Sequence, residues 1–159
     1  MNYESEFIIR TSPAFGVQIE QFRRSMINLS SFIAFHARQT PRRCALKYRG
    51  EEIAYAAFNE RIRIVGGWLV SCGIGPDDVV AVLMKNSAAF LDIAFAVSHI
   101  GAIFLPINYR LASNEIAYIV ENSGARLLIA DEESGASAAG PAPNSSSAIK
   151  RRASEFSTM

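Results

Sequence analysis

The region from Val79 to Ala130 alternates between short apolar runs and helical patterns, and this alternation constrains the fold most strongly. The apolar runs read as strands that are buried on both faces. They are Val79–Met84, Ala102–Ile107 and Arg126–Ala130, and the helical patterns between them are Ala88–Ile100 and Ser113–Ser123, the latter with Ser113 as its expected cap. Such strands, separated by helices, indicate a parallel sheet covered on both sides. We predict an α/β fold with a partial doubly wound parallel sheet.

A helix and a hairpin precede the sheet. Apolar residues recur at helical spacing from Leu29 to Ala37, and Pro41 follows the end of that helix. Cys44–Arg49 reads as a strand, and Ile53–Tyr55 resumes an extended course after a turn. The sequence therefore predicts an N-terminal segment made of one helix and one hairpin.

An amphipathic helix connects this segment to the sheet. Its stripe, spaced by 4, 3 and 4 residues, consists of Phe58, Ile62, Val65 and Leu69, and Gly73 suits the left-handed residue that ends a helix. Gly66 and Gly67 weaken this helix by roughly 1 kcal/mol each. We expect a closely packed neighbouring element to offset that cost.

Charge and composition exclude several classes of function. Lysine and arginine total 16 against 15 aspartates and glutamates, so the net charge of +1 gives no reason to bind nucleic acid or an anionic membrane. Two cysteines and two histidines are too few for a disulfide framework or a histidine-based metal site. The first 28 residues lack a basic, apolar secretory leader, which predicts a cytoplasmic protein.

Residues 88–107 are mostly apolar and as long as a bilayer span. Asp92 and His99 would be costly in hydrocarbon, and Gly101 and Pro106 interrupt the run. We predict a buried helix, a tight turn and a buried strand here, and no membrane span.

The composition changes after Asp131. Residues 132–159 are rich in serine and alanine and poor in large apolar side chains, which predicts a disordered tail. The domain organisation predicted from the sequence is an N-terminal extension over residues 1–28, a folded domain over residues 29–131 and this tail.

Several motifs in order resemble the N-terminal part of the AMP-forming acyl-CoA synthetases, of the adenylate-forming superfamily. The segment 53–58 (IAYAAF) resembles the family's first core motif, and 101–111 (GAIFLPINYRL) resembles its second. The segment 73–81 (GIGPDDVVA) resembles a third family pattern, with Asp77 in place of its last glycine. The resemblance covers residues 29–131, and the tail does not match.

This resemblance implies an enzyme class and its limits. The family uses ATP, Mg²⁺ and coenzyme A to convert a carboxylate into an acyl-CoA, with AMP and pyrophosphate as products. Its phosphate-binding loop, ribose-binding aspartate and lid lysine follow the part that this chain matches, so no catalytic, cofactor-binding or metal-binding residue is assigned. We expect a fragment that is inactive alone. The alternative is a non-catalytic module that docks on a homologue or on a separately encoded remainder of a synthetase.

Asn108 and Arg110 are the candidate site residues because they follow a strand end, where ligands of open α/β sheets bind. One interpretation places them beside a substrate or nucleotide channel. The other makes Asn108 a turn residue and Arg110 part of a structural ion pair.

His99 is expected to be a core or helix-terminal group, and Cys44 and Cys72 are expected to be buried small hydrophobes.

Overall fold

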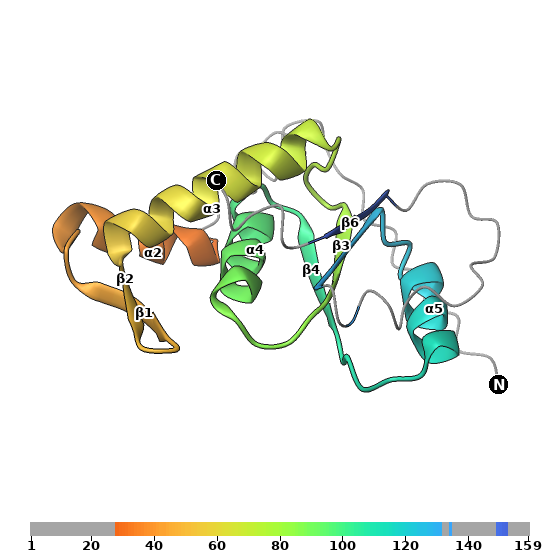
Figure 1. Ribbon diagram of the computed structural model, residues 1–159. Coiled ribbons are helices and arrows are strands. Elements are labelled where there is room, and N and C mark those ends of the chain that lie inside the picture. Colours follow the sequence, from red (N-terminus) through yellow and green to blue (C-terminus); the bar gives the residue numbers. More distant parts are fainter. Residues whose placement is uncertain (1–27, 132–133, 135–148, 153–159) are drawn as a thin grey trace, which may run out of the picture.

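Helices cover both faces of a four-stranded sheet in the computed structural model, which describes residues 28–131, 134 and 149–152 (Figure 1). The elements before the sheet are α2 (Leu29–Gln39), β1 (Cys44–Tyr48), β2 (Glu51–Ala54) and α3 (Tyr55–Ser71). The sheet region contains β3 (Val79–Leu83), α4 (Ala88–His99), β4 (Ile103–Ile107), α5 (Ser113–Asn122), β5 (Leu127–Ala130) and β6 (Ile149–Arg152). The predicted α/β fold is confirmed, and the predicted elements differ from the observed ones mainly at their ends.

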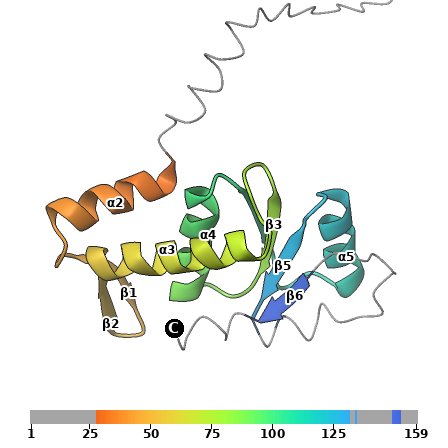
Figure 2. The same ribbon diagram turned by 90° about the horizontal axis from the view of Figure 1, so that it is seen from above.

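The sheet is entirely parallel, in the order β4-β3-β5-β6. Central Val80 is paired with Phe104 on one side and with Leu127 on the other. The helices α3 and α4 lie on one face and α5 on the other (Figure 2). The crossover through α4 runs from β3 to β4, and the crossover through α5 runs from β4 back past β3 to β5. Because the two run in opposite directions on opposite faces, they have the same hand, as a doubly wound sheet requires.

Apolar side chains form one core on each face of the sheet. The stripe of α3 is buried as predicted, with Phe58, Ile62, Val65 and Leu69 between 0% and 4% exposed. It packs with alternate residues of β3 and β5, such as Val80 and Ile129. The smaller core joins Ile116 of α5 to the opposite side chains of the strands. Full burial of each large side chain is worth about 1.5–3 kcal/mol.

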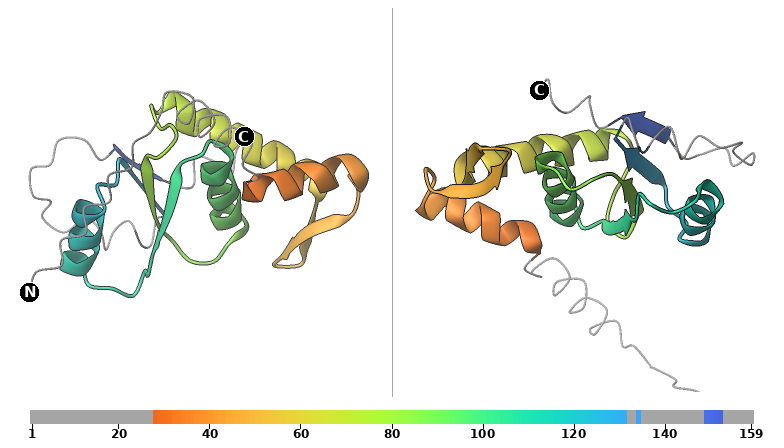
Figure 3. Two further views of the ribbon diagram at one scale, coloured as in Figure 1. Left: turned by 180° about the vertical axis from the view of Figure 1, so that it is seen from behind. Right: turned by 60° about the horizontal axis from the view of Figure 1, so that its bottom comes forward.

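The helix α2 is fastened to α4 at the end of the molecule that lies away from α5 (Figure 3). The Leu29 amide donates to Ser98 Oγ at 3.2 Å, and Ser30 Oγ lies 3.0 Å from His99 Nδ1. Asn28 caps α2 by accepting from the Ser31 amide at 3.1 Å. His99 is thus a helix-terminal group with a polar partner, which is one of the two roles expected for it.

The two glycines within α3 have different surroundings. A Cβ at Gly66 would lie 3.5 Å from both His99 Cδ2 and Ile100 Cγ2, so α3 and α4 approach closely there. A Cβ at Gly67 would meet nothing within 4 Å. The expected close packing is confirmed at Gly66. Gly67 lowers the stability of the helix, and no close contact there offsets that loss.

Replacing Gly67 by alanine is therefore expected to raise the free energy of unfolding by about 0.5–1 kcal/mol. Urea titration followed by circular dichroism would measure the change. The matched control is Gly73→Ala, because Gly73 has φ +79 and a side chain there is strained. That control should destabilise the protein, and a Gly67→Ala variant less stable than wild type would contradict the prediction.

The turn before β3 explains one departure from the family's pattern. Asp77 has φ 66, in the left-handed region that favours glycine, and it occupies the position where the family pattern has glycine. The next residue, Asp78, accepts from the Gly75 amide at 2.8 Å and from Arg126 Nη1 at 2.6 Å. These bonds connect the turn to the residue before β5. They also lower the pKa of the Asp78 carboxyl, and the hydrogen bond from Arg126 makes the largest contribution.

This lowered pKa gives a pH prediction. A carboxyl whose pKa is lower in the folded than in the unfolded state contributes stability above the unfolded value, about 4, and loses it as pH falls through the folded value. Wild type should melt at a higher temperature than Asp78→Asn at neutral pH, and the difference should shrink below about pH 4. Thermal melts of both proteins across pH test this, and a difference independent of pH would contradict it.

Three details of the sequence-based prediction were wrong. The cap of α5 is Ala112 rather than Ser113, because the Glu115 carboxylate accepts from the Ala112 amide at 2.8 Å. Cys44 is exposed, since it opens a hairpin that stands apart from the four-stranded sheet, and Cys72 is half-buried. Residues 149–152 were predicted to be disordered but form β6 beside β5.

The edge of β5 explains why residues 149–152 form a strand. Strand pairing uses backbone groups, so a segment with few apolar residues can still pair there. Ser134 is also ordered, and its side chain is buried. The predicted N-terminal extension lies, except for Asn28, outside the described residues, and so does the rest of the predicted tail.

The apolar stretch 88–107 forms α4, a turn at Gly101 with φ 78, and β4, in the predicted order. The prediction that this strand is buried was wrong, because β4 has a neighbour on one side only among the described residues and Ile103 is 49% exposed. Within residues 28–131, 134 and 149–152, no helix is long and apolar enough to cross a membrane.

Candidate functional site

The carboxyl ends of β3, β4 and β5 meet at one edge of the sheet. The connection from β3 leads to one neighbouring strand and the connection from β4 leads to the other side of β3, so the strand order reverses there. In open α/β sheets this reversal leaves a crevice in which ligands bind. The polar residues that follow the three strands are Lys85, Asn108, Tyr109, Arg110 and Asp131.

Asp131 joins the ends of β3 and β5. Its Oδ2 accepts from the Lys85 amide at 3.0 Å, and its Oδ1 accepts from the Ser134 amide at 2.7 Å. Burial alone would raise the pKa of this carboxyl, but the hydrogen bonds from Ser134 and Lys85 outweigh burial and lower it. The ionised form of Asp131 is therefore favoured, and its hydrogen bonds join the backbone that follows β3 to the backbone that follows β5.

The loop after β4 is an Asx turn. Asn108 Oδ1 accepts from the Arg110 amide at 3.0 Å, and the Asn108 carbonyl accepts from the Leu111 amide at 3.2 Å. Asn108 is therefore the turn residue of the second interpretation. The Arg110 guanidinium lies 5.6 Å from the ring centroid of Tyr109, and within the part of the chain that the structure describes it forms no ion pair. The ion pair expected in that interpretation is replaced by a cation–π contact.

Two cations flank the same aromatic ring. Lys85 Nζ lies 5.7 Å from the Tyr109 centroid, so Lys85, which follows β3, and Arg110, which follows β4, bring two positive charges to one exposed ring. Positive charge at this edge of the sheet attracts anionic ligands. The arrangement suits contact with a phosphate or carboxylate, but it supplies neither a nucleophile nor a proton-transfer pair.

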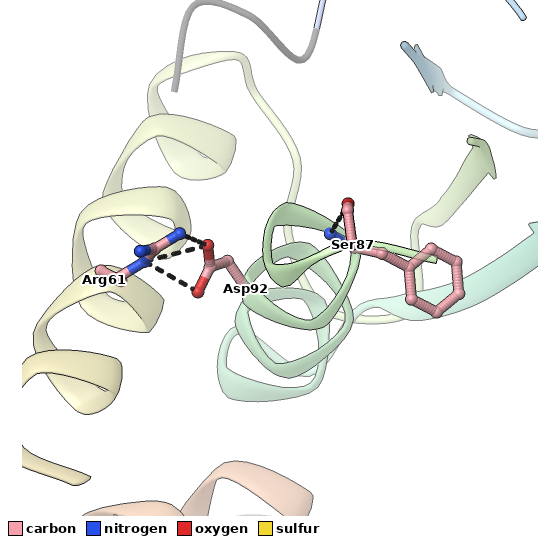
Figure 4. A network of polar contacts seen from close by, with 4 residues as sticks. Arg61, Ser87 and Asp92 are labelled. Atoms are coloured by element: carbon pink, nitrogen blue, oxygen red, sulfur yellow. Dashed lines mark hydrogen bonds and ion pairs between the residues drawn. The ribbon is translucent and has the colours of Figure 1, made fainter. Parts of the chain in front are cut away.

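A hollow of about 330 Å³ lies beside this edge, between the hairpin and the start of α4. It is lined by Leu46, Tyr48, Asn86, Ser87, Phe90 and Leu91. Ser87 caps α4 by accepting from the Phe90 amide at 3.1 Å (Figure 4). The hollow is open and mostly apolar, and its polar serine is already engaged by the helix.

The sequence matches a known family. A family model described as "AMP-binding enzyme" matches residues 33–156. The chain belongs to the AMP-binding enzyme family. The match extends beyond residue 131, so the expectation that the tail would not match was wrong, consistent with the presence of β6 in that region.

Curated relatives of this AMP-binding chain include acid–CoA ligases. A feruloyl-CoA synthase from Amycolatopsis sp is 35% identical over 101 residues, which are 64% of this chain and 21% of the relative. A 2-succinylbenzoate–CoA ligase from Geobacillus sp. (strain WCH70) is 38% identical over 95 residues, which are 59% of this chain and 19% of the relative. The chain thus spans about a fifth of the length of these relatives.

Solved structures show the same fold. The N-terminal domain of FACL13 from Mycobacterium tuberculosis has a TM-score of 0.76 and 27% identity, covering 84% of this chain and 36% of that domain. The artificially fused adenylation–carrier protein NpsA-ThdA from Klebsiella oxytoca has a TM-score of 0.69 and 21% identity, covering 81% of this chain and 23% of that protein. The AMP-binding chain resembles the N-terminal part of AMP-forming acyl-CoA ligases.

The described residues do not assemble a magnesium site. No group of three His, Cys, Asp or Glu side chains among residues 28–131, 134 and 149–152 could hold a metal ion. At the carboxyl edge of the sheet, Asp131 already accepts two backbone N–H groups.

Sequence reasoning found Asn108 and Arg110 at this edge but missed Lys85, Tyr109 and Asp131. The useful signal was the same for all five residues, because each follows the end of an apolar strand within three residues. The sequence could not show that the strand order brings the carboxyl ends of β3, β4 and β5 together.

Proposed function

We propose that this chain is the N-terminal portion of an AMP-forming acid–CoA ligase, which joins a carboxylic acid to coenzyme A at the expense of ATP. The family match over residues 33–156 carries the proposal. The named activities of the relatives, which include a feruloyl-CoA synthase and 2-succinylbenzoate–CoA ligases, support carboxylic acids as the substrate class. A cytoplasmic location belongs to this proposal, because ATP and coenzyme A are cytoplasmic metabolites.

In this proposal the chain contributes scaffold and charge rather than reacting groups. Lys85 and Arg110 place positive charge at the carboxyl edge, where it would favour the approach of the anionic substrates ATP and coenzyme A. The remaining four fifths of the ligase, continuous with this chain or supplied by another polypeptide, would bring the groups that screen phosphate charge during adenylation. The chain alone would then be inactive.

Carboxylate-dependent exchange of pyrophosphate into ATP tests the proposal. The full 159-residue chain is assayed alone and after co-expression with the part of the Amycolatopsis feruloyl-CoA synthase that lies beyond its matched region. We expect no exchange from the chain alone and ferulate-dependent exchange from the co-expressed pair, with the second polypeptide alone as control. Exchange by the 159-residue chain alone would overturn the proposed inactivity.

A non-catalytic role predicts a different result from the same assay. A pair that co-purifies but shows no exchange with any carboxylate would favour an assembly module that docks on a synthetase. Failure to form any complex would remove both the split-ligase and the assembly-module interpretations.

A further inference from the structure

The helix α2 carries apolar side chains on the side that faces solvent as well as on the side that faces the protein. Its inner side packs on α3 and α4, with Ser30 buried and Ile33 against the larger core. Its outer side carries Leu29, Phe32 and Phe35, which are 63%, 59% and 51% exposed. A surface helix normally turns polar side chains to solvent, so a row of this kind indicates a further contact. We call Leu29, Phe32 and Phe35 the outer face of α2.

The sequence that precedes the described part of the chain has a matching apolar pattern. Residues 1–27 end directly before Asn28, the N-cap of α2. Ser12 and Pro13 are residue types typical of a helix N-cap and of the first helical position. Beyond them, apolar residues recur at the helical spacing of 4, 3 and 4, at Phe15, Ile19, Phe22 and Met26. This pattern predicts an amphipathic helix with one apolar stripe.

The connection between this predicted helix, residues 13–26, and α2 fits a helical hairpin. Ile27 and Asn28 are the two residues between them, and antiparallel helices are joined by about 2–5 residues. Asn28 has an extended backbone, with φ -90 and ψ 168, so a helical course is interrupted there. At 1.5 Å per residue, the predicted helix would be about 21 Å long and α2 is about 16 Å long. The apolar stripe can therefore span the whole outer face.

Charge favours the antiparallel direction. In a hairpin, the residues before the predicted helix lie near the C-terminal end of α2. Arg38, Arg42 and Arg43 are exposed at that end. The first residues of the chain include Glu4 and Glu6. Opposite charges that face each other fix the orientation of a contact, so these charges agree with the short connection.

We propose that residues 13–26 form a helix that folds back on α2 and buries its outer face. The occupant of this face is thus a segment of the same chain, and the predicted N-terminal extension becomes a part of the folded domain. The inference does not depend on the proposed ligase activity, because it concerns contacts within one chain.

Hydrogen exchange of the full 159-residue chain, measured by mass spectrometry, tests this proposal. Amides of residues 13–26 should exchange about 100-fold more slowly in the native chain than in the chain unfolded in urea. Phe32→Gln, on the outer face, and Phe22→Gln, on the apolar stripe, should each lower that protection about tenfold. The matched control is Val70→Gln, because Val70 is an apolar residue of α3 that is 57% exposed and lies outside the outer face.

The exchange of α3 serves as the internal reference, since unchanged protection there shows that the core is intact. If Phe32→Gln also exposes α3, Phe22→Gln decides, because Phe22 belongs to the segment and not to α2. Loss of protection in the outer-face or stripe variants with an intact α3, but not in Val70→Gln, supports the proposal. Unprotected residues 13–26 in the wild-type chain, or equal protection in all variants, would overturn it. Protection that disappears on dilution would show that a second copy covers the outer face, and this result overturns the proposal as well.

Discussion

Replacing Arg61 by methionine is expected to lower the free energy of unfolding by about 3 kcal/mol, because it leaves the buried Asp92 carboxylate without its partner. Arg61 on α3 donates to Asp92 on α4 through Nε at 3.1 and 3.0 Å and through Nη2 at 2.5 Å (Figure 4). The Asp92 side chain is only 6% exposed. Burial raises its pKa despite the opposing hydrogen bonds from Arg61, so the carboxylate depends on this contact.

The matched control for this substitution lies two residues along α3. Arg63 pairs with Glu60 at 3.0 Å, but both side chains are more than half exposed, so Arg63→Met should cost between 0 and about 1 kcal/mol. The double variant Arg61→Met/Asp92→Leu removes the buried charge as well and should regain most of the loss. Urea titrations of the four proteins test this. Similar losses for the Arg61 and Arg63 variants would show that the buried pair has no special importance.

Leu69→Ala is the second substitution with a large expected effect. Leu69 is fully buried in the core between α3 and the sheet, so truncation should cost about 2–5 kcal/mol through lost burial and a cavity. The neighbouring Val70 is 57% exposed, and Val70→Ala should change stability by no more than about 0.5 kcal/mol. Circular dichroism melts of both variants make the comparison. A Leu69→Ala variant as stable as Val70→Ala would contradict the assigned core.

The size of these losses matters because natural domains are stable by only about 5–15 kcal/mol. Among the described residues, a single helix, α5, packs on the second face of the sheet. We expect the isolated wild-type chain to be marginally stable or prone to associate, and Leu69→Ala to be largely unfolded at room temperature. A cooperative melt at high temperature with monomeric elution would contradict this expectation for the wild type.

Much of the fold followed from patterns that act locally. The stripe from Phe58 to Leu69 predicts a buried helix face because side chains three and four residues apart share a side of a helix, and all four are buried. The continuous apolar run at β3 predicts a strand covered on both faces, and β3 is the central strand. Gly73 predicted the end of α3 because few other residues adopt its positive φ.

The parts that could not be predicted depend on contacts between distant segments. Cysteine is a residue type that is common in protein cores, but the exposure of Cys44 depends on where the hairpin lies relative to the sheet. The strand at residues 149–152 follows from the free edge of β5 and not from its own side chains. The pairing of Lys85 with Asp131 across 46 positions required the strand order, which no local pattern encodes.

The strand order also sets the sequence of events as the protein is made. The central strand β3 precedes both of its neighbours in the chain, so it leaves the ribosome with two unpaired edges. The sheet can begin to assemble only when β4 has emerged, and the second edge stays open until β5 follows, whereas α2, the hairpin and α3 can form earlier. During that interval an apolar strand is available to chaperones and to other nascent chains. The rate of translation between residues 84 and 130 should therefore influence how much of this protein reaches its folded state.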